Sequence, residues 1–127
     1  MVTRGIKQLI AEANAAVYTV SVPDAMVMHG DSDVVFVDVR ETVELRQAGS
    51  VAGAVHAPRG FLEFMADPES PLHKPELASG ARLLLYCASG GRSALAAKAL
   101  VDMGFENVAH IAGGFAAWQE AQGPVES

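Results

Sequence analysis

The chain has 127 residues, of which 50% are hydrophobic and 19% are charged, enough for one compact domain and too few for two of ordinary size. Its formal net charge of −6 argues against nucleic acid and anionic membrane surfaces as partners, because both would repel the average surface. A single cysteine excludes an internal disulfide bond and favours a reducing, cytoplasmic compartment. Polar residues interrupt the apolar stretch over residues 1–20, so we expect neither a signal peptide nor a membrane span there.

The first predicted element is an amphipathic helix over residues 3–16. Apolar residues recur there at helical spacing, namely Ile6, Leu9, Ile10, Ala13 and Val17. We expect this helix to cover the sheet or one end of the domain, with a dimer contact as the minor alternative. A short β-prone run over residues 18–22 and a short helix, begun by Ser21 and Pro23 and reaching about residue 28, follow it.

Residues 34–37 form the clearest buried strand, which runs into Asp38 and Arg40. Charges at the end of a buried parallel strand lie at the edge where ligands bind, so these two residues are candidates for orienting a functional loop. Capping of the next helix by Asp38 is an equally compatible interpretation. That helix is predicted over residues 41–47 and ends at Gly49, with Glu44 paired to Arg40 or Arg46.

Residues 51–58 are predicted to form one short strand that ends in proline. Arg59 follows directly and is a second candidate for binding an anion, although an exposed arginine at a helix start is at least as compatible with the pattern. The apolar turn over residues 61–65 is expected to be core or pocket wall. Three prolines among the polar residues 66–80 predict an irregular surface segment that could form one rim of a pocket.

The central feature of the chain is a strand over residues 82–86 that ends at Cys87, turns through two glycines and enters a helix reaching Met103. Glycines allow backbone amides to approach an anion closely, and a helix amino terminus adds attraction. The same field, with Arg92 nearby, would lower the thiol pKa from its ordinary value of about 8.5. A buried core cysteine is the alternative. The two glycines and the arginine favour a nucleophile.

The last strand is predicted over residues 107–111, followed by two glycines and a final helix bearing Phe115 and Trp118. We expect the glycines to allow close approach to the Cys87 loop and Trp118 to lie in the core. The four histidines (His29, His56, His73, His110) share no metal-ligand spacing, so we predict no metal site and ordinary surface or core roles for them. Alternating strands and helices predict an α/β fold with a parallel sheet and right-handed crossovers.

The sequence resembles the rhodanese family of sulfurtransferases in its single-domain form. The motifs are VDVRE at 37–41, GSVAGA at 49–54, CASGGRS at 87–93, and Gly104-Phe105 with GGF at 113–115 and Trp118. The resemblance implies one rhodanese-like domain over residues 1–127 with its core at about 18–122, built on a five-stranded parallel sheet flanked by helices on both faces.

The resemblance also implies a sulfurtransferase of the thiosulfate:cyanide class with no cofactor. Cys87 would take a sulfane sulfur from a small anionic donor, such as thiosulfate or a persulfide, and pass it to a thiol or cyanide. A protein acceptor is left open, as is the oligomeric state. The persulfide would lie within the loop Ala88, Ser89, Gly90, Gly91, Arg92 and Ser93, whose amides stabilise negative charge. Arg92 would hold the loop shape and add positive potential, with Asp38, Arg40 and Arg59 in support.

Two departures from the family pattern bear on the substrate. Many relatives carry a basic residue where this chain has Ala88, so thiosulfate is expected to be a weaker donor, and Ser50 replaces a histidine. Two other functions are compatible with the sequence. Related phosphatases and arsenate reductases share the fold but have one more residue between cysteine and arginine, and the tighter loop here suits one sulfur atom better. A persulfide carrier or recognition module working with a protein partner is the second alternative.

Overall fold

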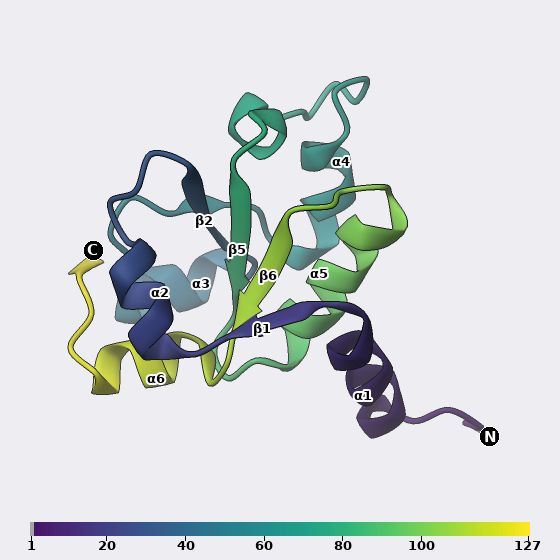
Figure 1. The fold of residues 1–127 in the computed structure, drawn as a ribbon, viewed down its shortest axis with the longest axis horizontal. Helices are drawn as coiled ribbons and strands as arrows, with labels where there is room; N and C mark the ends of the chain where they lie inside the picture. Colours follow the sequence, from purple (N-terminus) through teal and green to yellow (C-terminus); the bar gives the residue numbers. More distant parts are fainter. Residues whose placement is uncertain (1) are drawn as a thin grey trace.

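Five parallel strands form the central sheet of the computed structural model, which describes residues 2–127 (Figure 1). Their order across the sheet is β1-β6-β5-β2-β4. This arrangement confirms the predicted α/β fold with a five-stranded parallel sheet. The strands are β1 (Tyr18–Val20), β2 (Val34–Asp38), β4 (Val55–His56), β5 (Arg82–Tyr86) and β6 (Val108–Ile111).

Six α-helices lie within residues 2–127, and Figure 1 shows them arranged around the sheet. They are α1 (Ile6–Ala16), α2 (Val22–Met28), α3 (Thr42–Ala48), α4 (Leu62–Ala66), α5 (Gly91–Asp102) and α6 (Gly114–Glu120). Two short 3-10 helices, η1 (Arg59–Phe61) and η2 (Pro75–Ala78), lie in the connection between β4 and β5. No helix within residues 2–127 combines the length and the apolarity needed to cross a membrane.

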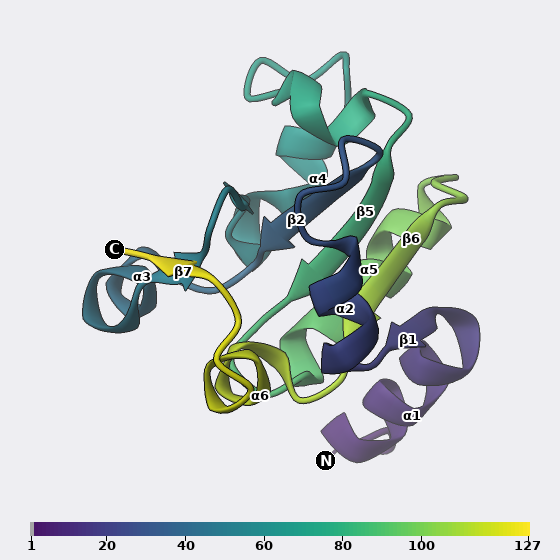
Figure 2. The same ribbon diagram turned by 60° about the vertical axis from the view of Figure 1, so that its left-hand side comes forward.

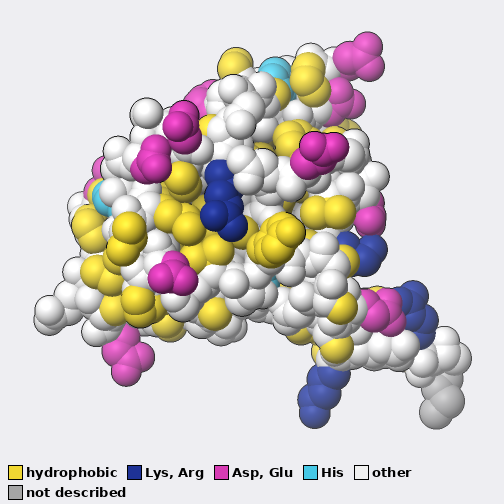
Figure 3. Space-filling model, viewed as in Figure 1, with side chains coloured by type: hydrophobic (Ala, Val, Ile, Leu, Met, Phe, Trp, Pro, Cys, Tyr) yellow, Lys and Arg dark blue, Asp and Glu magenta, His cyan; other side chains and the backbone are white. Residues whose placement is uncertain are grey.

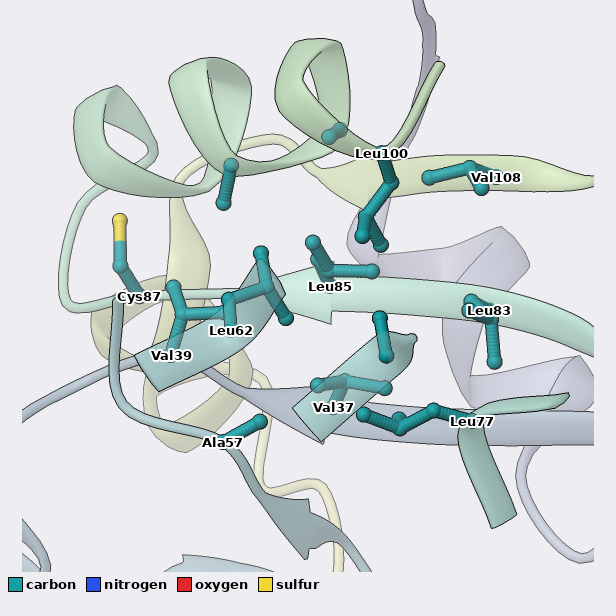
Figure 4. Packing of buried hydrophobic residues seen from close by; sticks show 13 residues of the cluster. Val37, Val39, Ala57, Leu62, Leu77, Leu83, Leu85, Cys87, Leu100 and Val108 are labelled. Atoms are coloured by element: carbon teal, nitrogen blue, oxygen red, sulfur yellow. The ribbon is translucent and has the colours of Figure 1, made fainter. Parts of the chain in front are cut away.

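Side chains that alternate along the central strand build two cores, one on each face of the sheet. Leu83 and Leu85 pack with Leu62 of α4 and Leu100 of α5, and Cys87 lies at the end of this cluster (Figure 4). On the other face, Leu84 and Tyr86 pack with residues of α2 and α6, including Ala25, Phe115 and Trp118. Helices therefore cover both faces, and the loop after β5 lies where the two layers meet.

A second, two-stranded antiparallel sheet joins β3 (Ser50–Val51) to β7 (Val125–Glu126). Figure 2 shows β7 lying beside α3, far from it in sequence. The prediction of one strand over residues 51–58 was therefore wrong, because the chain turns at Gly53, whose φ is +81°. The strand at 108–111 is likewise not the last one, since β7 follows α6.

Other element boundaries differ by a few residues from the predictions. α1 begins at Ile6, not residue 3, and α5 begins at Gly91, the second of the two glycines that were assigned to the turn. In the short apolar turn, Leu62 is buried as expected, but Phe61 and Phe64 are about half exposed. A helix as short as α4 can bury only one face against α5, so Phe64 within it and Phe61 just before it stay partly in solvent.

Candidate active site

Cys87 directly follows β5, with its sulfur directed toward the first turn of α5 (Figure 4). Gly90 has a φ of +117°, a conformation open to glycine, and turns the chain from the strand into the helix. As a result, the N–H of Gly90 donates to Sγ at 3.1 Å and the N–H of Ser93 at 3.4 Å. The Ser93 hydroxyl lies 3.6 Å from the same sulfur. Cys87 is only 1% exposed, yet its sulfur faces polar donors.

These donors decide the ionisation of the thiol. Burial acts to raise the pKa of Cys87, but hydrogen bonds from the Ser93 hydroxyl and from the N–H groups of Ser93, Gly90 and Ser89 outweigh it. The pKa of Cys87 therefore lies below its ordinary value, and a larger fraction is thiolate at neutral pH. Among the predicted loop residues, Ser89, Gly90 and Ser93 supply the contacts to the sulfur.

The amino end of α6 packs directly on the backbone of this loop. The N–H of Phe115 donates to the Cys87 carbonyl at 2.8 Å, and the N–H of Ala116 donates to the Ala88 carbonyl at 3.1 Å. A Cβ at Gly114 would lie 2.5 Å from the Cys87 carbonyl oxygen, so only glycine allows this approach. The close approach of the glycine pair to the Cys87 loop, which the sequence predicted, is thus present, and it holds the loop backbone against the start of α6.

Arg92 makes a bidentate ion pair with Glu44 of α3, with both N···O distances at 2.8 Å. The hydrogen bond to Arg92 lowers the pKa of Glu44 to about 2. The expected pairing of Glu44 with Arg40 or Arg46 is replaced by this longer-range contact. Arg92 holds the loop against α3, while much of the positive potential expected of it is offset by the carboxylate.

Asp38 and Arg40 form a buried ion pair beside the loop, at 2.7 Å between Nη2 and Oδ2. Arg40 also donates to the Gly49 carbonyl at 2.7 Å and lies over the Phe115 ring at 4.2 Å. Asp38 does not cap α3, because Glu41 and Glu44 form the capping box there. The pair thus supports the loop indirectly, through the contact of Arg40 with Phe115. Asp38 and Arg40 hydrogen-bond each other and the backbone, and not Cys87.

Arg59 lies at the start of η1 and pairs with Glu63 at 2.8 Å, one helical turn further on. Its side chain is one third exposed. Its backbone N–H donates to the Val39 carbonyl at 3.0 Å, which ties η1 to the end of β2. The structure therefore favours the interpretation of Arg59 as a surface arginine at a helix start.

The sequence did not predict a chain of hydrogen bonds that runs from Ser93 through His110 to Asn14. The Ser93 hydroxyl lies 3.0 Å from Nδ1 of His110 on β6, and Nε2 of that ring lies 2.8 Å from Oδ1 of Asn14 on α1. His110 is 3% exposed, and burial lowers its pKa. The one available signal was a histidine inside an otherwise apolar, buried strand.

Neither a large basic patch on the face seen in Figure 3 nor a cluster of metal-binding side chains within residues 2–127 accompanies this site. Acidic side chains are spread over the face seen in Figure 3, and basic side chains do not gather into one large patch on that face. Within residues 2–127, no group of three or more His, Cys, Asp or Glu side chains is close enough to hold a metal ion.

The parallel sheet and the cysteine loop define the chain as a rhodanese-like α/β domain. It belongs to the rhodanese-like family, whose model, described as "Rhodanese-like domain", matches residues 21–121. A solved structure from Rhodopseudomonas palustris, of a protein of unknown function and possible tyrosine phosphatase, is 48% identical, with a TM-score of 0.96 and coverage of 99% of this chain and 97% of that one.

Two curated relatives broaden this comparison. A sulfurtransferase of Allochromatium vinosum is 30% identical over 86 residues, which are 68% of this chain and 72% of that protein. A tRNA uridine(34) hydroxylase of Mesorhizobium japonicum is 31% identical over 121 residues, which are 94% of this chain but only 38% of that protein. The family and its sulfurtransferase members support sulfur transfer at the level of the family.

Proposed function

We propose that this chain is a sulfurtransferase in which Cys87 carries a sulfane sulfur from a donor, such as thiosulfate or a persulfide, to a thiol or cyanide. The observation that supports this most directly is the sulfur of a buried cysteine facing the N–H groups of Gly90 and Ser93 at 3.1 and 3.4 Å. Such donors stabilise the thiolate that must attack, and they stabilise negative charge on the persulfide that forms.

In the first half-reaction, the Cys87 thiolate attacks the outer sulfur of thiosulfate. A new S–S bond forms on Cys87, the S–S bond of thiosulfate breaks, and its electron pair leaves with sulfite. In the second half-reaction, an acceptor thiolate or cyanide attacks the terminal sulfur and Cys87 leaves as thiolate. The protein contributes backbone donors and no redox group, because each step exchanges one two-electron bond for another.

The loop size and its polar groups suit one sulfur atom. Four residues separate Cys87 from Arg92, and the guanidinium of Arg92 is paired with the Glu44 carboxylate. The N–H groups of Ser89, Gly90 and Ser93 converge on the position of a single sulfur atom, which suits a persulfide sulfur better than a tetrahedral oxyanion. Ala88 brings no charge of its own to the loop, so we propose that a singly charged or protein-bound persulfide is used more efficiently than the thiosulfate dianion.

A persulfide carrier that serves a protein partner is the second candidate function. The specific support is the match to a putative sulfur carrier protein of Bacillus subtilis, which is 32% identical over 88 residues and of which this chain spans 43%. A carrier would form the same Cys87 persulfide but would turn over small acceptors slowly. The loading step is therefore common to both candidates, and the acceptor distinguishes them.

Intact-protein mass spectrometry after incubation with a persulfide donor tests the proposal. We expect the mass of one added sulfur atom, located on Cys87, and its loss after cyanide is added with formation of thiocyanate. Cys87→Ser should abolish both signals while keeping the fold, because serine fits the site but is a far weaker nucleophile. Turnover of p-nitrophenyl phosphate without any sulfur adduct would contradict the proposal and support a phosphatase instead.

A further inference from the structure

His110 is connected to the reactive sulfur by a single hydroxyl group. Ser93 Oγ lies 3.6 Å from Cys87 Sγ and 3.0 Å from His110 Nδ1. Ser93 stands in the first turn of α5 and is fully buried, as is nearly all of His110 on β6. The three side chains thus form a continuous hydrogen-bonded line from the thiol into the sheet.

The partners of the other ring nitrogen favour one tautomer. Nε2 lies 2.8 Å from Asn14 Oδ1, an atom that can only accept, and 3.3 Å from the Thr19 hydroxyl, which can also accept, so this arrangement places the ring hydrogen on Nε2. In the neutral ring, Nδ1 is then free of hydrogen and accepts from the Ser93 hydroxyl. The Gly90 carbonyl, 3.2 Å from the same hydroxyl, competes for that hydrogen, but the imidazole nitrogen at 3.0 Å is the stronger base.

The polar groups around the ring leave Cys87 as the proton source within this network. The polar groups within hydrogen-bond reach are Asn14 from α1, Thr19 from β1 and Ser93 from α5, and all are uncharged. An open cavity of about 510 Å³ against the ring is lined by uncharged residues of α1, β1, the Cys87 loop and the β6–α6 connection. Cys87 is thus the one titratable group that this network joins to His110 within the described residues.

We propose that His110 is a positioning residue that draws the proton of Cys87 through Ser93 and holds it while the thiolate reacts. The S–H bond of Cys87 breaks as an O–H bond forms at Ser93, and the original O–H bond of Ser93 breaks as an N–H bond forms at Nδ1. The products are a thiolate, an unchanged serine and an imidazolium. In that state, the imidazolium donates to Ser93 and Ser93 donates to the thiolate.

This inference rests on the proposed function only in that the thiolate is the nucleophile.

Asn14 also has a role in the relay, since its carbonyl oxygen keeps the ring oriented and accepts from the Nε2–H of the imidazolium. The burial that lowers the pKa of His110 keeps the ring neutral before transfer, when it must accept. The relay stabilises the thiolate and the imidazolium as a pair, so the two groups titrate together.

Alkylation of Cys87 by iodoacetamide, followed against pH, measures this coupling without any sulfur donor. In His110→Gln, we expect the midpoint of the profile to move to higher pH and the rate at neutral pH to fall about tenfold for each unit of that shift. Combined with Ser93→Ala, His110→Gln should produce no additional shift, because the connection is already cut. His73→Gln, whose ring contacts the Met65 carbonyl instead, is the matched control and should behave as wild type.

An unchanged profile in folded His110→Gln, or a shift that persists in the Ser93→Ala background, would overturn the proposal. If His110→Gln does not fold, ring ¹⁵N chemical shifts in the unmodified protein give the same answer. The His110 ring should titrate together with Cys87 and change its titration when Cys87 is alkylated. If the titration of the His110 ring does not change when Cys87 is alkylated, the relay is wrong. Persulfide formation at Cys87 can still be measured in that case, and it tests the proposed function separately.

Discussion

Two opposite charges, those of Asp38 and Arg40, lie close to the reactive loop and are almost completely buried. Their side chains are 1% and 3% exposed, so neither can be compensated by water if its partner is lost. Arg40 spans from Asp38 to the Gly49 carbonyl and the Phe115 ring, and the backbone N–H of Phe115 in turn donates to the Cys87 carbonyl. At the scale of single residues, this pair supports the site without contacting sulfur.

Replacing Asp38 by Asn should destabilise the protein by about 3–5 kcal/mol, because it leaves the Arg40 charge buried without its counter-ion. The free energy of unfolding measured by urea denaturation tests this. Asp102→Asn is the matched control: it breaks an exposed pair with Lys98 and should cost less than about 1 kcal/mol. Equal losses in the two variants would contradict the role given to burial.

At the scale of elements, α3 and α6 hold the Cys87 loop from two directions. α6 bonds the loop carbonyls through its first N–H groups, and α3 reaches Arg92 through Glu44. Neither helix contributes a group that contacts the sulfur. Loop geometry is therefore set by two packing contacts that lie far from Cys87 in sequence, and each can be weakened separately.

Gly114→Ala tests the α6 contact. The added methyl group would lie 2.5 Å from the Cys87 carbonyl oxygen and 2.8 Å from the Ala88 carbonyl carbon, so helix and loop must separate. We expect a loss of stability of about 1–3 kcal/mol and slower persulfide formation. Gly60→Ala, where a Cβ meets nothing within 4 Å, should leave both nearly unchanged. Wild-type behaviour of Gly114→Ala would show that α6 does not set the loop.

Glu44→Gln tests the α3 contact through its pH dependence. The pKa of Glu44 is lowered from 4.5 to about 2, so its stabilising effect is fully present above about pH 4.5 and is lost as pH falls toward 2. Wild type should exceed Glu44→Gln in stability by about 1 kcal/mol at neutral pH. That difference should shrink between pH 4.5 and pH 2 in thermal unfolding experiments. A difference that stays constant across this range would contradict the assigned pairing.

At the scale of the whole molecule, the carboxyl-terminal residues 124–126 pack against the segment around Gly49, which is bonded to the buried Asp38–Arg40 pair. β7 pairs with β3, and the Trp118 indole N–H donates to the Pro124 carbonyl at 2.9 Å. A Cβ at Gly49 would lie 2.6 Å from the Glu126 carbonyl oxygen, which shows how closely the two segments approach. Since Arg40 donates to the Gly49 carbonyl, residues 124–126 are connected to the buried ion pair through Gly49.

The local sequence patterns predicted most of the sheet, because buried strands such as 34–37 and 82–86 are continuous apolar runs with turn residues on either side. The family motifs then supplied the strand count and the role expected of Cys87. The actual partners of Glu44 and His110 were not predicted, for a shared reason. Their partners, Arg92 and Ser93, are 48 and 17 residues away, and the packing of helices on the sheet decides such contacts. The small β3–β7 sheet escaped because two-residue strands carry no periodicity.

Trp118 has a practical consequence because it is the chain's single tryptophan. It lies fully buried beside Phe36, with ring centroids 5.5 Å apart, in the core on the opposite face of the sheet from the Cys87 side chain. Its intrinsic fluorescence therefore comes from one known position. A change in this emission while sulfur is loaded onto Cys87 would show that the core on the opposite face of the sheet changes conformation as the persulfide forms.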